Sequence, residues 1–307
     1  LCQAVRAHLA LDDTTTITAM RLVHMKPYKV IVLIFIGLLS QACKNDDNPL
    51  VESNINNFTF EDGFETQNNT VDELFPLNGS RLTGIQQVDP ANSTNEISIS
   101  RTIFSEGEGA LRLLANQSDA ILSKMDIEKE GFNASEADKV IINADFYINS
   151  DANIENLLLI DLECCSCWDN TTNVENQCPG IRLQMSGGND FLSIERGKIA
   201  ENTIQQTSFP FPRKEWVTVQ WELILADDEN GLTKLLINGI EVINSNGANM
   251  PNAQKFRDLF AQEGIDFNLQ EPIYYERIQL GATANPTSAD IELFVDNFSL
   301  TIEKNVP

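Results

Sequence analysis

Residues 216–239 read WVTVQWELILADDENGLTKLLING, and this stretch decides the fold. Every second residue from 217 to 225 is apolar, whereas the residues between them are mostly polar. Successive side chains of a β-strand point to opposite faces, so the segment has one face for a core and one for solvent. The acidic segment 227–231 predicts a turn, and Asn238-Gly239 is the strongest short signal for a hairpin. The stretch therefore predicts consecutive antiparallel strands over one core.

The same alternation recurs along the chain, separated by Gly, Asn, Asp and Pro. It is found at residues 140–149, 158–163 and 181–186. One segment differs, because residues 251–263 start with Pro and space Phe256, Leu259 and Phe260 as on a helix. No repeat, low-complexity tract or linker interrupts residues 58–307. We therefore predict one all-β domain, a two-sheet antiparallel sandwich with one short surface helix.

Residues 25–42 have the pattern of a secretory signal peptide. A basic flank at 25–29 precedes the apolar run 30–39, and a small residue stands before Cys43. The run is shorter than the roughly 20 residues that a membrane-spanning helix needs. The alternative is that residues 30–39 form a buried core strand or helix. We expect translation to start at Met25, which makes residues 1–24 an over-extended start.

Leu39-Ser40-Gln41-Ala42-Cys43 resembles a lipobox. The following Lys44-Asn45-Asp46-Asp47 resembles the charged signal of Bacteroidetes-type surface lipoproteins. The resemblance implies lipidation at Cys43, with residues 43–57 as a flexible polar tether. Two acyl chains are sufficient for stable membrane anchoring. We therefore expect an exported protein that is anchored to the outer membrane and faces the cell surface.

Removal of residues 1–42 would leave 17 basic and 43 acidic residues, a net charge of −26. Such a charge disfavours nucleic acid, anionic membrane surfaces and polyanionic glycans, unless a basic patch or divalent cations intervene. The simpler reading is a solubilising surface. Both histidines, His8 and His24, lie in the removed segment. This excludes histidine as a catalytic base, metal ligand or pH switch in the mature protein.

Several segments resemble strands of concanavalin A-like jelly rolls, the laminin-G-like sandwich of lectins, glycan-binding modules and some polysaccharide lyases and glycoside hydrolases. They are FEDGFE at 60–65, GEGALRL at 107–113, residues 216–225 with LING at 236–239, IQLGATAN at 278–285 and LFVDNF at 293–298. The resemblance implies a jelly roll over about residues 58–303, with sugars bound on its concave sheet. These motifs specify a fold more than a function.

The polar faces of the predicted strands carry groups suited to sugars, namely aromatic rings and planar hydrogen-bonding groups. The carbohydrate-binding candidates are Tyr147, Asp161, Glu163, Arg182, Gln184, Trp216, Gln220, Tyr275 and Arg277. If the strands are neighbours, these residues line one sheet together with Asn143, Asp145 and Glu195. The alternative is an ordinary solvated outer face.

Two catalytic chemistries are compatible with these residues. A glycoside hydrolase would use paired carboxylates, such as Asp161 and Glu163 on one strand face. A lyase of the resembled fold would use Tyr147 or Tyr275 as acid and base, with Arg182 neutralising a uronate. Glu163 and these three residues are the catalytic candidates. The motifs E-x-D-x-x-E, R-x-E-L-R and Q-I-H are absent from the sequence.

Four cysteines remain in the predicted domain, an even number that favours two disulfides in an exported protein. They are Cys164, Cys165, Cys167 and Cys178. A Cys164–Cys165 bond would be strained, so we expect Cys178 to bond one of these two. A second bond would close the Cys-Ser-Cys turn or its neighbour. A four-thiolate zinc site is the alternative. Trp168 either caps a groove or covers the disulfides.

The jelly-roll resemblance also implies a structural Ca²⁺ ion, held by Glu61 of the first strand and Asp296 of the last. The alternative for Asp296 is a plain strand-end turn. We expect no organic cofactor.

Three functions are compatible with the sequence. They are polysaccharide binding without cleavage, a polysaccharide lyase or glycoside hydrolase on the same face, and a structural or adhesive surface protein without a glycan site.

Overall fold

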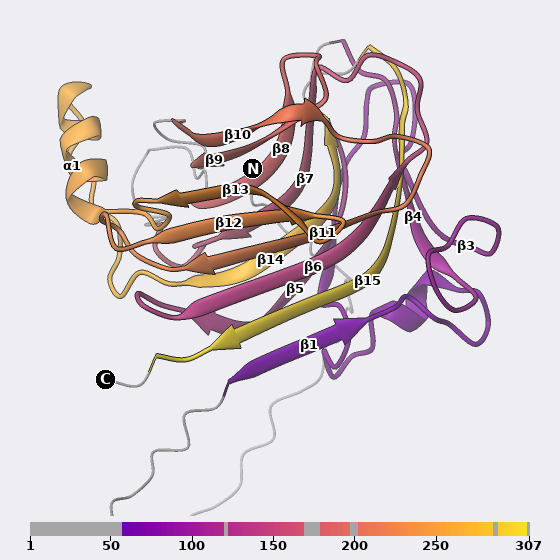
Figure 1. Ribbon diagram of the computed structural model, residues 1–307, viewed down its shortest axis with the longest axis horizontal. Helices are drawn as coiled ribbons and strands as arrows, with labels where there is room; N and C mark the ends of the chain where they lie inside the picture. The colour runs from indigo at the N-terminus through magenta and orange to yellow at the C-terminus, as the bar shows by residue number, and fades with distance from the viewer. Residues whose placement is uncertain (1–56, 120–121, 169–178, 197–201, 285–287, 306–307) are drawn as a thin grey trace, which may run out of the picture. The chain divides into compact units, whose positions relative to one another are not determined.

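The computed structural model shows two antiparallel β-sheets and one short α-helix, which confirms the predicted sandwich (Figure 1). It describes residues 57–119, 122–168, 179–196, 202–284 and 288–305. The predicted signal peptide and lipidated Cys43 lie outside these residues and stay predictions. No helix in the described ranges is long and apolar enough to cross a membrane.

Sheet A has eight strands, with the first and last strands of the domain side by side (Figure 1). From edge to edge they are β13 (Ile240–Asn246), β12 (Leu232–Ile237), β11 (Val217–Ile224), β6 (Lys139–Ile148), β15 (Ile291–Glu303), β4 (Ala110–Ala115) and β3 (Glu96–Ser100), with β1 (Phe58–Asp62) paired to β15. The long β15 pairs with β4 along residues 291–295 and with β1 along residues 298–302.

Sheet B has seven strands. In order they are β10 (Asn202–Pro210), β9 (Phe191–Arg196), β8 (Gly180–Ser186), β7 (Asn156–Glu163), β14 (Tyr275–Ala284), β5 (Ser123–Ala134) and β2 (Gly84–Val88). Strands β7 to β10 follow one another along the sheet, whereas β14 comes from late in the chain and lies between β7 and β5. Residues far apart in sequence therefore meet at the centre of sheet B. A 3₁₀ helix, η1 (Val71–Leu74), precedes β2.

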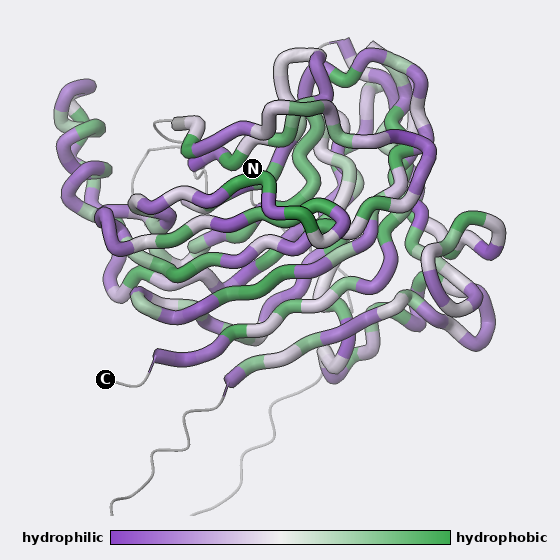
Figure 2. Tube along the Cα trace, viewed as in Figure 1, coloured by the Kyte–Doolittle hydropathy of each residue, from purple (hydrophilic) through white to green (hydrophobic). Residues whose placement is uncertain are grey.

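The core lies between the two sheets and uses the apolar positions that the alternation predicts. In β11, Val217, Val219, Trp221 and Leu223 are all fully buried. Figure 2 shows apolar and polar residues alternating along the strands. The hairpin turn is also confirmed, because Asn238 and Gly239 have φ angles of 50° and 78° between β12 and β13. Positive φ at both central positions is the requirement that Asn-Gly satisfies.

The predicted helix is confirmed as α1 (Ala253–Gln262). The side chain of Asn252 caps it by accepting from the backbone N–H of Lys255 at 2.9 Å. Phe260 packs against Phe267, with ring centroids 4.6 Å apart, and Trp168 packs against both rings. Trp168 is buried in this cluster. It covers the loop after β7 and is not the exposed cap of a groove.

One disulfide of that loop is described, and it joins Cys164 to Cys167. It closes the short turn that contains Cys165. The bond expected for Cys178 falls on a residue outside the described ranges. Because Cys164 is bonded to Cys167, we now predict that Cys178 bonds Cys165.

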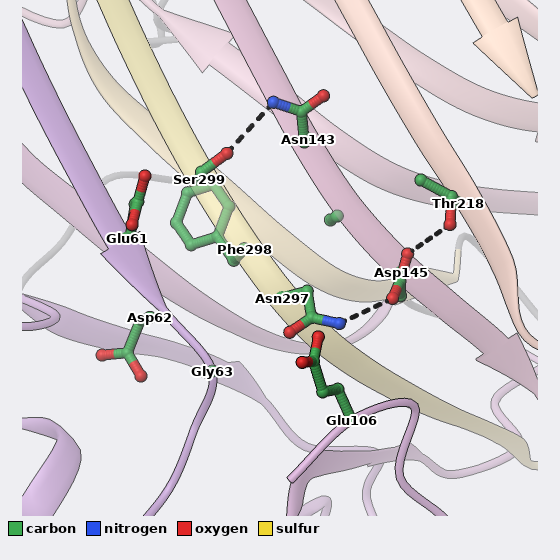
Figure 3. Close-up of a pocket in the computed structure, with 11 residues that line it drawn as sticks. Glu61, Asp62, Gly63, Glu106, Asn143, Asp145, Thr218, Asn297, Phe298 and Ser299 are labelled. Carbon is green, nitrogen blue, oxygen red and sulfur yellow. Dashed lines mark hydrogen bonds between the residues drawn. The ribbon is translucent and has the colours of Figure 1, made fainter. Parts of the chain in front are cut away.

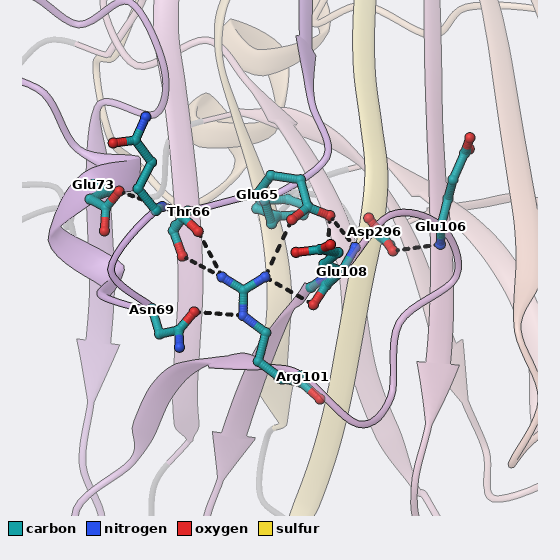
Figure 4. Close-up of polar contacts among 12 residues, drawn as sticks. Glu65, Thr66, Asn69, Glu73, Arg101, Glu106, Glu108 and Asp296 are labelled. Atoms are coloured by element: carbon teal, nitrogen blue, oxygen red, sulfur yellow. Dashed lines mark hydrogen bonds and ion pairs between the residues drawn. The ribbon is translucent and has the colours of Figure 1, made fainter.

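Arg101 holds two loops together at the end of the sandwich where β1 and β3 end (Figure 4). Its guanidinium donates to the carbonyl oxygen of Thr66 at 2.7 Å, to Oδ1 of Asn69 at 2.7 Å and to the carbonyl oxygen of Glu108 at 2.9 Å. It also lies 3.3 Å from the carboxylate of Glu65. These contacts fix the segment after β1 against the loop between β3 and β4.

Candidate functional site

The predicted sugar-binding residues do not line one sheet, so that prediction is wrong. Sheet B carries Asp161, Glu163, Arg182, Gln184, Tyr275 and Arg277 on β7, β8 and β14. Sheet A carries Tyr147 and Gln220 on β6 and β11, with Trp216 directly before β11. The alternation tells which side of its own strand a residue takes, but it does not tell which strands are neighbours.

Tyr275 is corrected most strongly, because it points into the core. Its side chain is fully buried, and its hydroxyl donates to the carbonyl oxygen of Asn249 at 2.6 Å. Burial raises the pKa of this phenol far above its usual value. The regular pairing of β14 with β5 ends at Arg277, because the two steps from Arg277 to Tyr275 face four steps of β5, from Glu130 to Ala134. Alternation along β14 does not predict the side of a residue beyond such an irregularity.

We call the outer side of sheet B face B. Its polar side chains include Gln86, Lys124, Asp126, Glu128, Glu130, Asp161, Glu163, Arg182, Gln184, Ser193, Glu195, Arg277, Gln279 and Thr283. One row crosses five adjacent strands as cross-strand partners, in the order Glu195, Arg182, Asp161, Gln279, Glu128. Face B is therefore a continuous polar strip.

The centre of face B is an ion pair between Arg277 and Glu163. Nη2 and Nε of Arg277 donate to Oε2 of Glu163 at 2.6 and 2.9 Å. Gln279 joins this pair to Glu128, since its Nε2 donates to Glu163 at 3.1 Å and to Glu128 at 3.0 Å. Gln279 therefore places the carboxyl groups of Glu128 and Glu163 side by side on this face.

A second cluster lies beside it around Asp126. Oδ2 of Asp126 accepts from the hydroxyl of Thr283 at 2.6 Å and lies 3.2 Å from Nζ of Lys124. Nζ of Lys124 also donates to Oε1 of Gln279 at 2.7 Å, which connects the two clusters. Gly281 permits the close packing, because a Cβ there would lie 2.7 Å from Oδ1 of Asp126.

Two carboxyl groups of face B have raised pKa values. Burial raises the pKa of Asp126, against the attraction of Lys124. Burial also raises the pKa of Glu128, against the attraction of Arg277. Glu128 is the more accessible of the two, with 13% of its side chain exposed against 2% for Asp126. Glu128 is therefore the better placed to exchange a proton with a bound molecule.

The remaining charges of face B form its rim. Nε of Arg182 donates to Oδ2 of Asp161 at 3.1 Å. Glu195 accepts from the hydroxyl of Thr203 at 2.8 Å. With the two clusters and Glu130, the cross-strand partner of Arg277, face B holds six carboxyl groups and three cations. This excess of acid opposes a polyanion while all six groups are ionised.

Sequence reasoning missed Lys124, Asp126, Glu128 and Gln279. The signal was present, because the first three alternate with the buried Met125 and Ile127 along β5. What the sequence did not contain was their proximity to β7 and β14.

The two predicted calcium ligands are not brought to a common pocket. Glu61 lines a pocket on sheet A that does not include Asp296. The carboxylate of Asp296 is fully buried and accepts backbone N–H groups from Ser105, Glu106 and Asn297. Among the described residues no group of three or more Asp, Glu, His or Cys side chains is placed to hold a metal. Calcium stays a prediction.

Comparison with known proteins identifies the fold. No model of a protein family matches the sequence, and no curated protein matches it. Among solved structures, an endo-β-1,4-glucuronan lyase from the fungus Trichoderma reesei has a TM-score of 0.52 at 10% identity, covering 71% of this chain and 94% of that one. Alginate lyase Aly36B has a TM-score of 0.51 at 11% identity, covering 81% and 96%. The concanavalin A-like jelly roll is thus confirmed.

Proposed function

We propose that this protein is a polysaccharide lyase whose substrate, a uronate-containing chain, lies across face B. The observation that carries the proposal is the cluster of Arg277, Glu163, Gln279 and Lys124 at the centre of this face. Support comes from the fold, which a glucuronan lyase and an alginate lyase also have. We further propose, from the sequence pattern alone, that the enzyme is exported and anchored through Cys43.

A β-elimination needs three groups: one that neutralises the uronate carboxylate, one that removes a ring proton and one that protonates the leaving oxygen. Arg182 can pair with a uronate carboxylate through two N–H groups at once, because its bond to Asp161 uses Nε. Arg277 holds Glu163 in place, since its Nε and Nη2 already bind that carboxylate. Glu128 is the proposed acid, because its raised pKa keeps more of it protonated. Face B has no tyrosine or histidine among its residues. We assign Lys124 as the proton acceptor, after its ammonium group has passed a proton to Asp126, which lies 3.2 Å away and whose pKa burial raises.

The test is an assay with alginate, glucuronan and neutral polysaccharides as substrates. Ultraviolet absorbance of unsaturated uronates reports elimination, and new reducing ends report any cleavage. We expect elimination products from at least one polyuronate. Lys124→Met should reduce the rate by about 100-fold or more, while the same change on the other sheet, Lys234→Met, should leave it unchanged. Reducing ends without unsaturated product would replace the lyase by a hydrolase that uses Glu128 and Glu163.

A second candidate is polysaccharide binding without cleavage. The observation in its favour is the burial of the central groups, since Glu163 is fully buried and Gln279 is 1% exposed. A buried ion pair holds strands in register without any chemistry. Retardation of the protein in gels that contain a polysaccharide, with no product from it, would support this candidate against the lyase.

A further inference from the structure

The outer side of sheet A, which we call face A, contains a pocket with a volume of about 560 Å³ (Figure 3). Strands β1, β6, β11 and β15 and the loop between β3 and β4 contribute to its walls. Small-molecule sites usually have about 300–1,000 Å³, so the pocket is large enough for a sugar unit. It lies on the opposite sheet from face B.

The pocket is organised by Asp145 on β6. Its carboxylate accepts from Thr218 Oγ1 at 2.6 Å, Asn297 Nδ2 at 2.8 Å and Ser105 Oγ at 2.7 Å. These three donors come from β11, β15 and the loop after β3. Asp145 is itself buried. It therefore fixes the positions of neighbouring polar groups while contributing little charge to the opening.

Two amides and two carboxylates remain for a ligand. Nδ2 of Asn143 donates to Oγ of Ser299 at 3.0 Å, which leaves its amide oxygen and a second N–H. Asn297 takes a φ of 49° at the irregular pairing between Asp296 and Ser299 and lines the pocket. Within the described chain, no hydrogen bond or ion pair engages the side-chain carboxylates of Glu61 and Glu106, which also line it. Sugar hydroxyls match this set of donors and acceptors.

An aromatic cluster lies one row further along the same face. Tyr147 follows Asp145 by two residues on β6, and Trp216 precedes Thr218 by two, so each is about 6.6 Å along its strand from the pocket lining. The ring centroids of Tyr147 and Trp216 are 5.6 Å apart. Phe294 packs edge-on to Tyr147 at 5.9 Å and 86°, which fixes that ring. Both Tyr147 and Trp216 are partly exposed.

We propose that the pocket and this cluster form a second carbohydrate site, which takes an uncharged pyranose chain. The aromatic rings would cover the C–H surface of one sugar unit, and the amides and carboxylates would bind the hydroxyls of the next. The carboxylates of Glu61 and Glu106 repel uronates, and no Lys or Arg lines the pocket to balance them. The other two carboxyl residues of the lining add little charge, because Asp62 is paired with Arg81 and Asp145 is buried. Face A would therefore bind a neutral part of a glycan, whereas face B acts on an acidic one.

The test is binding of neutral hexasaccharides, namely cellohexaose, xylohexaose, mannohexaose and laminarihexaose, with an alginate hexasaccharide as the anionic probe. Titration calorimetry gives Kd, and tryptophan fluorescence reports the place. Trp221 is fully buried and Trp168 is 3% exposed, so a ligand on face A should change the emission of Trp216. We expect at least one neutral hexasaccharide to bind and the alginate probe to leave this signal unchanged.

Four variants locate the binding. Asn143→Ala and Ser299→Ala should each weaken binding about tenfold, the cost of one lost hydrogen bond, and Trp216→Phe should remove the fluorescence change. The matched control, Arg182→Ala on face B, should leave Kd unchanged. The proposal is overturned if no neutral hexasaccharide binds at about 1 mM. It is also overturned if Arg182→Ala weakens binding while neither Asn143→Ala nor Ser299→Ala does. Product formation by face B is measured separately, so failure of either proposal leaves the other standing.

Discussion

Face A and face B look alike in the sequence, since both consist of polar residues that alternate with a buried apolar set. In the structure they differ in how much of their charged side chains is exposed to solvent. The Arg277–Glu163 pair of face B has side chains 9% and 1% exposed, whereas the Lys234–Glu241 pair of face A has side chains 29% and 44% exposed. Alternation therefore identifies outward residues, but it does not show whether they are solvated.

The cause of the difference is the order of residues across the strands. On face B, opposite charges occupy adjacent strands, as with Arg182 beside Asp161 and Arg277 beside Glu163. Each side chain finds its partner within one strand spacing, so the pairs can cover one another. Charges lose hydration only where such partners compensate for it. Face A has amides, hydroxyls and rings at its centre and keeps an open pocket.

The largest expected effect comes from breaking the central pair of face B. Arg277→Ala leaves Glu163 buried without its guanidinium, and we expect a loss of about 3–5 kcal/mol in the free energy of unfolding. Urea denaturation measures it. Lys234→Ala, which breaks the exposed pair of face A, should leave stability unchanged within error. Equal effects of the two variants would remove the distinction between the faces.

A smaller effect is expected for Asp145→Asn in face A. An amide group would meet donors from Thr218, Asn297 and Ser105 where a carboxylate now accepts them. Leaving one buried donor unmatched costs about 1–3 kcal/mol. The control is Asp126→Asn on face B, whose Oδ1 has no hydrogen-bond partner among the described residues. The new amide of Asp126→Asn meets no donor at the Oδ1 position. A larger loss of stability in Asp126→Asn than in Asp145→Asn would therefore contradict the assignment of Asp145 as the organising group.

Local features of the fold were predictable from the sequence, because they depend on neighbouring residues. Alternation at 140–149 and 217–225 predicted β6 and β11, Asn238-Gly239 predicted the turn, and the spacing of Phe256 and Phe260 predicted α1. Each of these signals is contained within about ten residues.

The site was less predictable, because it is assembled over long distances in sequence. Glu163 and Arg277 meet only because β7 and β14 are neighbours, which a period of two does not reveal. Tyr275 lies beyond the irregular pairing of β14 with β5, where alternation did not predict its side. The candidate residues were therefore mostly outward, as predicted, but they were divided between two faces and the core.

A still smaller effect on stability is expected for Tyr275, whose side chain lies in the core and on neither face. Tyr275→Phe removes the hydroxyl that donates to the carbonyl oxygen of Asn249, and we expect a loss of about 1 kcal/mol in the free energy of unfolding. Thermal denaturation measures it. Because the ring faces away from face B, any activity on polysaccharide should persist at the wild-type rate below the melting temperature. A specific loss of activity in a folded variant would return Tyr275 to the list of catalytic candidates.

The smallest expected effect is a difference in the pH dependence of stability. Burial raises the pKa values of Asp126 and Glu128 in the folded protein above the ordinary values of 3.8 and 4.5. As pH rises through this window, these groups ionise first in the unfolded chain, so the folded state loses stability. The double variant Asp126→Asn/Glu128→Gln lacks both groups and should lose less stability than the wild type between about pH 4 and pH 7. Melting temperatures across this range measure the difference. If the double variant lost stability with rising pH as steeply as the wild type, desolvation of Asp126 and Glu128 would be contradicted.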